Sequence, residues 1–287
     1  MPRPYEPPVD SPRSLAEAYP LLAGARPIAG GTDLMVQITG ELGEPPGRVV
    51  DIWGLDELRG IRIEGEFLVV GALTTYTDIQ RSDAVHRRLP VLAEVAATIG
   101  AAQIQNRGTI GGNVVNASPA GDTLPVLLAT DAVIVLRSAR GERSVPAAEF
   151  FPEYRRTARA EDELVLAVRF PIDPGRQVRF RKVGTRRAQA ISKVVIALSW
   201  EADGSGSDAR WHGVRAALGS VAPTPVRAPA TEAVLEGAAP SQETADAAAA
   251  ALEAEIQPID DVRSTAAYRK AVAGRVLHRI IRDAGGW

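Results

Sequence analysis

The chain has 287 residues, 45% of them hydrophobic, which is enough to bury the cores of about two domains. Its 33 basic and 35 acidic side chains nearly cancel and form no like-charged block, which argues against a nucleic-acid or membrane-surface partner. Cysteine is absent, which excludes disulfides, thiolate catalysis, Cys-ligated zinc and any iron–sulfur cluster carried by this chain.

The first part of the chain alternates short strands with helices. Helical spacing predicts helices over 11–24, 34–38 and 82–100, and the last of these carries Leu89, Leu92, Val95, Ala96 and Ile99 on one face. β-Branched and apolar runs predict strands over 27–29, 48–55 and 67–79, and the strand over 67–79 enters a threonine-rich turn.

The second part begins with a helical run from Thr123 and ends in two long helices. Strands are predicted over 132–138, 163–171, 177–184, 193–202 and 211–221, with a boundary at 172–176 where proline and glycine occur. The final helices are predicted over 241–256, with Ser241 as N-cap, and over 261–284, with Gly285 as the stop. The pattern indicates an α+β domain to about residue 173, then a smaller sheet with a helical layer.

The remaining bulk features indicate a protein without a metal site of its own. The three histidines, His86, His212 and His278, lie far apart and lack metal-ligand spacing, so surface or capping roles are expected. Neither a signal-peptide core nor an 18-residue apolar span occurs, so we expect a cytoplasmic protein without a membrane span, which binds small molecules or proteins.

Two glycine pairs, at 30–31 and 111–112, stand in similar polar surroundings. Thr32 and Asp33 follow the first pair, and Thr109 and Asn113 flank the second. Backbone without Cβ atoms can turn several N–H groups inward and bind phosphate oxygens, so the two segments together would suit a diphosphate. Because Asp33 would repel that anion, its carboxylate is expected to turn back as a helix cap.

Tight turns are the simpler explanation of each glycine pair taken alone. The occurrence of two pairs with matching flanks favours the phosphate interpretation. Neither segment fits GxGxxG or GxxxxGK[ST], so a doubly wound nicotinamide-binding sheet and a P-loop hydrolase both lose support.

Four phrases resemble, in order and spacing, the FAD-binding medium subunit of the molybdenum hydroxylases, the xanthine dehydrogenase and carbon monoxide dehydrogenase group. They are "AGGTDL" (29–34), "GALTT" (71–75), "QNRGTIGGNVVNASPAGDTLP" (105–125) and "DDVRSTAAYRKAVAGRVL" (260–277). The resemblance covers nearly the whole chain. It implies an α+β fold with a two-part FAD-binding domain of the vanillyl-alcohol-oxidase (PCMH) type over 1–173, divided near 55–60. A C-terminal domain over 174–287, with a three-stranded antiparallel sheet and a helical layer, would follow.

The resemblance also implies which residues hold FAD. Asp122 would accept hydrogen bonds from cofactor hydroxyls, Lys182 would lie near the flavin or its acceptor side, and Ile99 and Leu164 would contact the ring. The residues matching the family's diphosphate-binding motifs are Ala29, Gly30, Gly31, Thr32, Asp33, Leu34, Thr109, Ile110, Gly111, Gly112 and Asn113.

Each of these side chains also has an ordinary structural explanation. Asp122 is a suitable helix N-cap, Lys182 could be a solvated strand residue, and Ile99 and Leu164 could simply be core residues. Arg107 could counter the diphosphate charge or pair with a surface carboxylate, and the sequence favours neither.

In the family that the chain resembles, the chemistry takes place on the flavin, so no catalytic side chain is expected here. The resemblance implies a large partner with molybdopterin, a small partner with two [2Fe–2S] clusters, and a dimer of heterotrimers. Electrons would pass from the clusters through FAD to NAD or another acceptor. The absence of cysteine agrees with clusters held by a partner.

Two departures bear on the family branch and on access to the flavin. Thr32 and Asp33 stand where carbon monoxide dehydrogenase subunits tend to have histidine and serine, which favours the xanthine-type and related hydroxylases. Ala190 stands where many relatives have aspartate, which leaves the route of the acceptor open.

Two rival functions remain at this point. One is a stand-alone flavoprotein oxidase or reductase of the same fold, and the other is a flavin-free structural subunit. Co-purifying iron and molybdenum chains would argue against the first, and a yellow protein would argue against the second.

Overall fold

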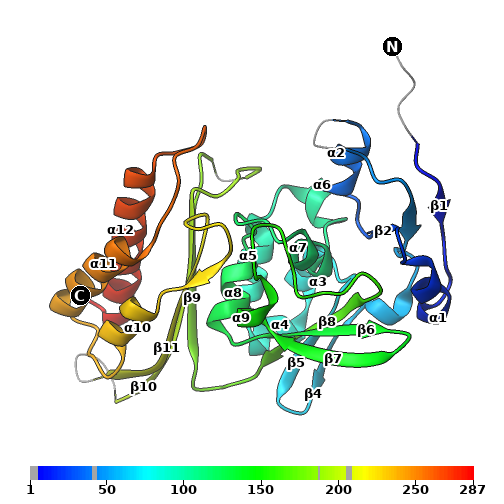
Figure 1. Cartoon of the computed structure of the whole chain (residues 1–287). Coiled ribbons are helices and arrows are strands. Elements are labelled where there is room, and N and C mark those ends of the chain that lie inside the picture. Colours follow the sequence, from blue (N-terminus) through cyan, green and yellow to red (C-terminus); the bar gives the residue numbers. More distant parts are fainter. Residues whose placement is uncertain (1–5, 41–43, 187, 205–208) are drawn as a thin grey trace.

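The computed structural model describes residues 6–40, 44–186, 188–204 and 209–287. Within these ranges the strands form three sheets, with helices packed on and between them (Figure 1). The two glycine segments belong to the part of the molecule that contains the first two sheets, and the C-terminal residues form the third sheet and its helices.

The first sheet is parallel and small. Its order is β1 (Val9–Asp10), β3 (Val49–Asp51) and β2 (Arg26–Ile28). The helix predicted over 11–24 is shorter, with α1 (Leu15–Ala18) capped by Ser14 and followed by the 3₁₀ turn η1 (Tyr19–Leu21). Pro20 has no N–H to continue the α-helical bonding, which explains the early end. Helix α2 (Leu34–Ile38) has the predicted bounds.

The second sheet has five antiparallel strands among the described residues. In spatial order they are β4 (Ile61–Glu64), β5 (Phe67–Gly71), β8 (Leu164–Pro171), β6 (Val133–Ser138) and β7 (Gly141–Pro146). The strand predicted over 67–79 ends at Gly71. Thr75 and Asp78 form a capping box that starts helix α3 (Tyr76–Arg81), so the threonine-rich turn is followed by a helix.

Helices cover the second sheet and connect its strands. Pro90 divides the helix predicted over 82–100 into two, because proline is well tolerated only in the first turn of a helix. The helices of this layer are α4 (Asp83–Arg88), α5 (Pro90–Thr98), α6 (Ala102–Gln105), α7 (Ile110–Asn116), α8 (Leu124–Ala129) and α9 (Ala147–Phe150).

The third sheet is antiparallel and has one more strand in the described chain than the three predicted. Its order is β12 (Val226–Arg227), β11 (Arg210–Gly219), β10 (Val194–Asp203) and β9 (Gln177–Val183). The additional strand β12 lies in the proline-containing phrase 223–229, where only a strand break was predicted. Two residues give too short a run for an alternating pattern, which is why the sequence did not reveal β12.

Three helices pack on the third sheet (Figure 1). They are α10 (Pro229–Leu235), α11 (Gln242–Glu255) and α12 (Ala266–Gly285). Ser241 caps α11 as predicted. The last helix starts at Ala266 rather than 261, because Asp261 accepts hydrogen bonds from two backbone amides and closes a turn. Its stop is Gly286, which adopts a left-handed conformation, and not Gly285.

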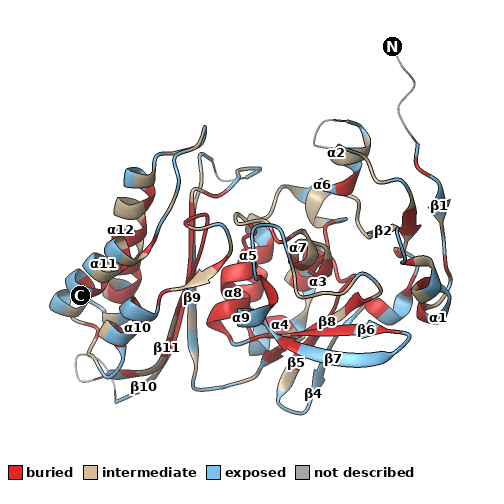
Figure 2. Cartoon of the chain, viewed as in Figure 1, coloured by how far each residue is buried: buried red, intermediate tan, exposed pale blue. Residues whose placement is uncertain are grey.

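The hydrophobic core is continuous from the second sheet to the third. Its largest cluster includes Leu124, Leu127 and Ile134 from the second-sheet layer and Val195 and Ala217 from the third sheet. Figure 2 shows α8 buried between these two sheets, and each of its six residues is buried. The C-terminal residues therefore pack directly against α8, the helix that follows the second glycine segment.

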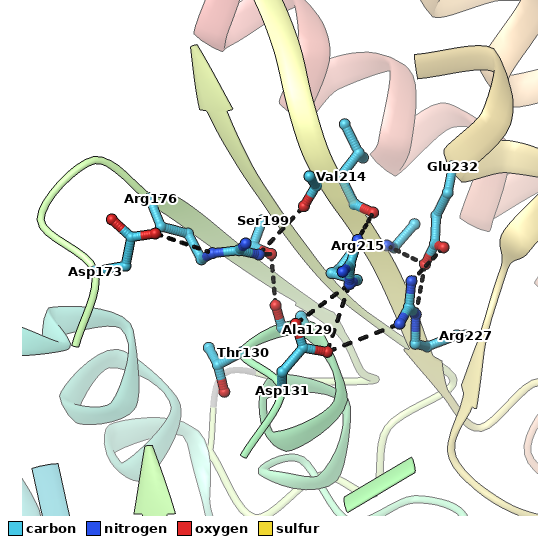
Figure 3. A network of polar contacts seen from close by, with 12 residues as sticks. Ala129, Thr130, Asp131, Asp173, Arg176, Ser199, Val214, Arg215, Arg227 and Glu232 are labelled. Atoms are coloured by element: carbon cyan, nitrogen blue, oxygen red, sulfur yellow. Dashed lines mark hydrogen bonds and ion pairs between the residues drawn. The ribbon is translucent and has the colours of Figure 1, made fainter. Parts of the chain in front are cut away.

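A polar network holds the C-terminal end of α8 against the third sheet (Figure 3). The Ser199 hydroxyl donates to the carbonyl of Ala129, and the Asp131 carboxylate lies 3.3 Å from Arg215 Nε and 3.8 Å from Arg227 Nη1. Arg176 donates to the Ser199 hydroxyl over 3.1 Å. These bonds fix the position of α8. Its N-terminal end, at Leu124, follows directly after Asp122 and Thr123.

Candidate functional site

The two glycine segments meet in one pocket. Although about 80 residues apart in the sequence, they line the same cavity, together with the start of β8. The expected cofactor residues that line it are Ala29, Gly30, Gly31, Thr32, Asp33, Leu34, Ile99, Thr109, Gly111, Gly112, Asn113 and Leu164. The predicted meeting of the two glycine segments at one site is therefore seen in the structure.

The first segment leaves its main-chain donors open. Gly31 has φ +79°, a left-handed conformation that favours glycine and turns the chain between β2 and α2. In the described structure no protein group accepts a hydrogen bond from the amides of residues 31–34. Four successive N–H groups beside a cavity suit an anionic ligand.

The second segment differs, because its amides are already bonded. Thr109 caps α7 by accepting from Gly112 N over 3.0 Å, and Gly111 N donates to the carbonyl of Ala72 over 2.9 Å. The amides of Ile110 and Asn113 bond to Thr74 and Thr109 in the same way. The prediction of a second amide cradle is therefore wrong. The glycine pair lies in the first turn of helix α7. The sequence did not indicate this helix, because the stretch has few apolar side chains.

Glycine is needed in both segments for close approach of backbones. A Cβ atom added to Gly30 would lie 1.7 Å from the carbonyl oxygen of Arg107, and one added to Gly111 would lie 2.6 Å from the Cβ of Ala72. Arg107 stacks on Trp53, with its guanidinium 3.9 Å from the ring centroid, and in the described chain it pairs with no carboxylate. Its other possible role, as a countercharge for the diphosphate, stays a prediction.

Asp33 connects the two segments by a side-chain bond. Its carboxylate accepts from Asn116 Nδ2 over 2.9 Å, and Arg155 donates to Asn116 Oδ1 over 3.2 Å. The carboxylate makes no capping bond to α2, so the expected cap is wrong, although Asp33 does occupy the N-cap position. Burial raises the pKa of Asp33, and the charge of Arg155 and the Asn116 bond oppose that rise.

The two apolar residues that the resemblance assigns to ring contacts, Ile99 and Leu164, line the pocket. Ile99, at the C-terminal end of α5, is half-buried, and Leu164, the first residue of β8, is buried. Ile110 instead points into the core, where it is fully buried, and it is not among the lining residues.

Asp122 and Lys182 form a buried ion pair beside the pocket. Lys182 Nζ lies 2.6 Å from Asp122 Oδ2 and donates to the carbonyl of Thr98 over 2.9 Å, and the Ser192 hydroxyl donates to the other Asp122 oxygen. Burial raises the pKa of Asp122, against the opposing effect of Lys182. Asp122 caps no helix and Lys182 is not solvated, so both simple structural explanations are wrong.

This ion pair is connected to the pocket lining by hydrogen bonds that involve Thr98 and Thr123. Thr98 precedes the lining residue Ile99, and the Thr123 hydroxyl donates to Oδ1 of the lining residue Asn113. Because Lys182 belongs to β9, the pair joins the third sheet to the wall of the pocket. Asp122 and Lys182 are not themselves lining residues.

Five polar lining residues were not predicted from the sequence: Arg26, Gln37, Tyr76, Asn116 and Arg159. The phenol of Tyr76 is buried, its hydroxyl has no hydrogen-bond partner in the described chain, and burial raises its pKa. Arg26 and Arg159 line the pocket from β2 and from the segment before β8. Tyr76 followed the "GALTT" phrase and could have been found from it, whereas the arginines lie in phrases without any motif.

The described residues contain no group of three or more His, Asp or Glu that could hold a metal ion. His86 contacts the carbonyl of Gln80, and His212 and His278 lie beside carboxylates, in agreement with the expected surface roles. In the part of the chain that was searched, no helix is long and apolar enough to cross a membrane.

Two family models together match most of the chain. Residues 6–173 match the FAD-binding domain in molybdopterin dehydrogenase, and residues 179–284 match the CO dehydrogenase flavoprotein C-terminal domain. The first match contains both glycine segments and Asp122, and the second contains Lys182.

Individual relatives agree over nearly the full length. The chain is 34% identical to the carbon monoxide dehydrogenase medium chain of Hydrogenophaga pseudoflava, over 96% of this chain and 95% of that one. It is 30% identical to the xanthine dehydrogenase FAD-binding subunit of Escherichia coli O157:H7, over 95% of both chains. A solved structure of carbon monoxide dehydrogenase from Hydrogenophaga pseudoflava has a TM-score of 0.91 at 35% identity and covers 98% of both chains. These identities do not decide between the carbon monoxide dehydrogenase branch and the xanthine-type and broader aldehyde or heterocycle hydroxylases, because the glyceraldehyde dehydrogenase medium chain of Sulfolobus acidocaldarius is also 34% identical.

Proposed function

This chain belongs to the family of FAD-binding domains in molybdopterin dehydrogenase, and from that premise we propose that it is the flavin-carrying subunit of a molybdenum hydroxylase. It would receive electrons from [2Fe–2S] clusters on a small partner chain, and pass them through FAD to NAD or another acceptor. A large partner chain with molybdopterin would oxidise the substrate. The observation that carries this proposal is the convergence of two distant glycine segments on one pocket.

The residues of the pocket fit a flavin dinucleotide. Open amides at residues 31–34 offer donors for a diphosphate, and apolar lining by Ile28, Ile52, Ile99 and Leu164 suits planar rings. The partnerless hydroxyl of Tyr76 and the partnerless Nε of Arg159 are buried donors that need an acceptor. Each of these features is explained by an elongated ligand with both polar and aromatic parts.

When bound, FAD supplies the redox chemistry, and the protein contributes position and exclusion of water. The first segment would hold the diphosphate through its amides, and the packed helix α7 would fix the opposite wall. We assign Asp122 to a cofactor hydroxyl, as the resemblance implies, because its carboxylate has acceptor sites beyond the bonds from Lys182 and Ser192. Since Asp122 lies behind the lining residues, that hydroxyl would have to reach it between them. Lys182 would then orient Asp122 and keep it ionised.

The relatives' names support a subunit rather than a stand-alone enzyme. Those proteins are called a medium chain and an FAD-binding subunit, and this chain has no cysteine to hold clusters. We therefore propose a cytoplasmic assembly with a molybdopterin chain and a [2Fe–2S] chain, arranged as a dimer of heterotrimers.

The test is purification of the tagged chain together with its neighbouring genes. We expect a yellow protein with about one FAD per chain, and companions that contain iron and molybdenum. Reduction of the flavin by substrate of the complex, followed by reoxidation with NAD or artificial acceptors, would identify the acceptor. A colourless chain that gains no flavin absorbance with added FAD would contradict the proposal, and flavin without metal-containing companions would favour a stand-alone flavoprotein.

A further inference from the structure

The pocket contains two unpaired positive charges. The charged side chains among its described lining residues are Arg26, Asp33 and Arg159. Within the described chain, neither arginine forms an ion pair with a carboxylate, and Arg26 makes no side-chain hydrogen bond. The acidic residues next to Arg159 in the sequence are paired elsewhere, since Asp162 lies 2.8 Å from Arg140 and Glu163 lies 2.6 Å from Arg143.

Arg159 is fixed in place through Nη1, while its buried Nε has no acceptor. Its Nη1 donates to the carbonyls of Ala160 over 2.9 Å and Glu163 over 2.7 Å, which holds the guanidinium plane. Its Nε is buried and has no hydrogen-bond partner in the described structure. Burial, and then the nearby charge of Arg26, lower the pKa of Arg159. Glu163, Glu161 and Asp162 oppose this lowering of the pKa, but in the described chain none of them forms an ion pair with Arg159. Two guanidinium groups, the exposed one of Arg26 and the more buried one of Arg159, thus repel each other beside the cavity.

We propose that Arg26 and Arg159 supply the countercharge for the diphosphate of the dinucleotide in this pocket. This inference rests on the proposed function and adds residues that neither the glycine motifs nor the family resemblance include. The open amides of the first segment carry only partial charges, and Asp33 adds a negative charge to the same pocket. A dianion bound there needs formal positive charge, and guanidinium groups bind phosphate oxygens strongly. The anion would also relieve the repulsion between the two arginines and give Arg159 Nε an acceptor.

The experiment compares ligands with and without phosphate on the full chain after its flavin has been removed. Binding of FAD and of riboflavin is titrated by flavin fluorescence for the wild type, Arg159→Met and Arg26→Met. We expect each substitution to raise the Kd for FAD about tenfold or more, because a charge-assisted hydrogen bond is lost. The Kd for riboflavin, which has no phosphate, should change less than about twofold.

A matched control is Arg156→Met, since Arg156 lies three residues before Arg159 but is exposed and faces Glu153 at 3.5 Å. Because Arg159 also bonds to backbone carbonyls, thermal melting of each flavin-free variant checks the fold. Arg26→Met removes no side-chain bond of the protein and so gives an independent result. Rising salt should weaken FAD binding more in the wild type than in the variants.

Equal losses of affinity for FAD and riboflavin would overturn the inference, because the arginines would then act on the ring or on the fold. Unchanged FAD affinity in both variants would also overturn it. In either case the proposed function would stand, provided that the wild type binds FAD. A wild-type chain that binds no FAD would remove both proposals.

Discussion

The two glycine segments look alike in sequence but differ in what their backbones do. At residues 31–34 the amides are open towards the pocket, and the turn at Gly31 needs a left-handed conformation. At residues 110–113 the amides are bonded within the protein, and Gly111 packs against Ala72 with no room for a side chain. The first segment leaves its amide donors free for a ligand, and the second uses its amides and its glycines for packing within the protein.

This difference shows that the same dipeptide meets two physical requirements. In the first segment the absence of Cβ permits a conformation, and in the second it permits a close contact. Substitutions should therefore separate the two roles. Changes in the second segment should reduce the stability of the fold, and changes in the first should reduce cofactor affinity while the fold remains.

The largest effect is expected for Gly111→Val. A Cβ atom there would lie 2.6 Å from the Ala72 Cβ and 2.8 Å from its carbonyl oxygen, so β5 and α7 would have to move apart. Overpacking of this kind costs about 3 kcal/mol of unfolding free energy, and the flavin site would be lost with it. Thermal melting and flavin content of the purified variant measure both effects.

Gly54→Val is the matched control, because an added Cβ at Gly54 has no atom within 4 Å. That variant should melt like the wild type and keep its flavin. If Gly111→Val lost flavin but melted at the wild-type temperature, the second segment would be a binding segment as well, and the contrast between the two would disappear.

The sequence predicted that the two glycine segments meet in one pocket, but it did not predict the hydrogen bonds that shape the pocket walls. The motif phrases identified the two glycine segments that line the pocket, because these segments and their flanks are short-range patterns. The amide bonding of α7 was not predictable, since Gly111 bonds to Ala72 and Ile110 to Thr74 through contacts formed only by folding. Long-range pairs such as Lys182 with Asp122 were open to inference only through the family resemblance.

The same distinction explains the errors in the fold. Helix bounds set by a local cap, such as Ser241 and Thr75, follow from neighbouring residues, and the first of these was predicted. The short strand β12 depends on pairing with β11, and the pocket residue Arg159 depends on where the segment before β8 folds. Neither position carries a periodic pattern or a motif, so single-sequence reasoning had no signal to use.

An intermediate effect is expected for Gly31→Ala. The added methyl group would meet the flexible Met35 side chain at 3.2 Å and the Ile28 side chain at 3.6 Å, but alanine at φ +79° is strained by about 1 kcal/mol. The loop should relax and turn its amides away, which would raise the Kd for FAD about tenfold. Gly40→Ala is the control, because Gly40 has φ +84° and open space around it. Equal FAD affinity in both variants would mean that the amides of the first segment do not bind the cofactor.

The smallest effect is expected for Asp33→Asn, and it tests whether the first segment binds an anion. Burial raises the pKa of Asp33 above its ordinary 3.8, so in the flavin-free protein the ionised carboxylate costs stability above the folded pKa. That cost is relieved as pH falls from the folded pKa towards 3.8. An anion bound nearby is repelled only by the ionised form, so FAD affinity should rise as the pH is lowered through the same window. Asparagine should remove this pH dependence and improve binding about twofold at pH 7, since its amide oxygen can still accept from Asn116.

Asp83→Asn, which is exposed on α4, should retain the wild-type pH profile. If Asp33→Asn showed the wild-type profile too, the anion would lie away from the first segment, and the open amides there would need another explanation.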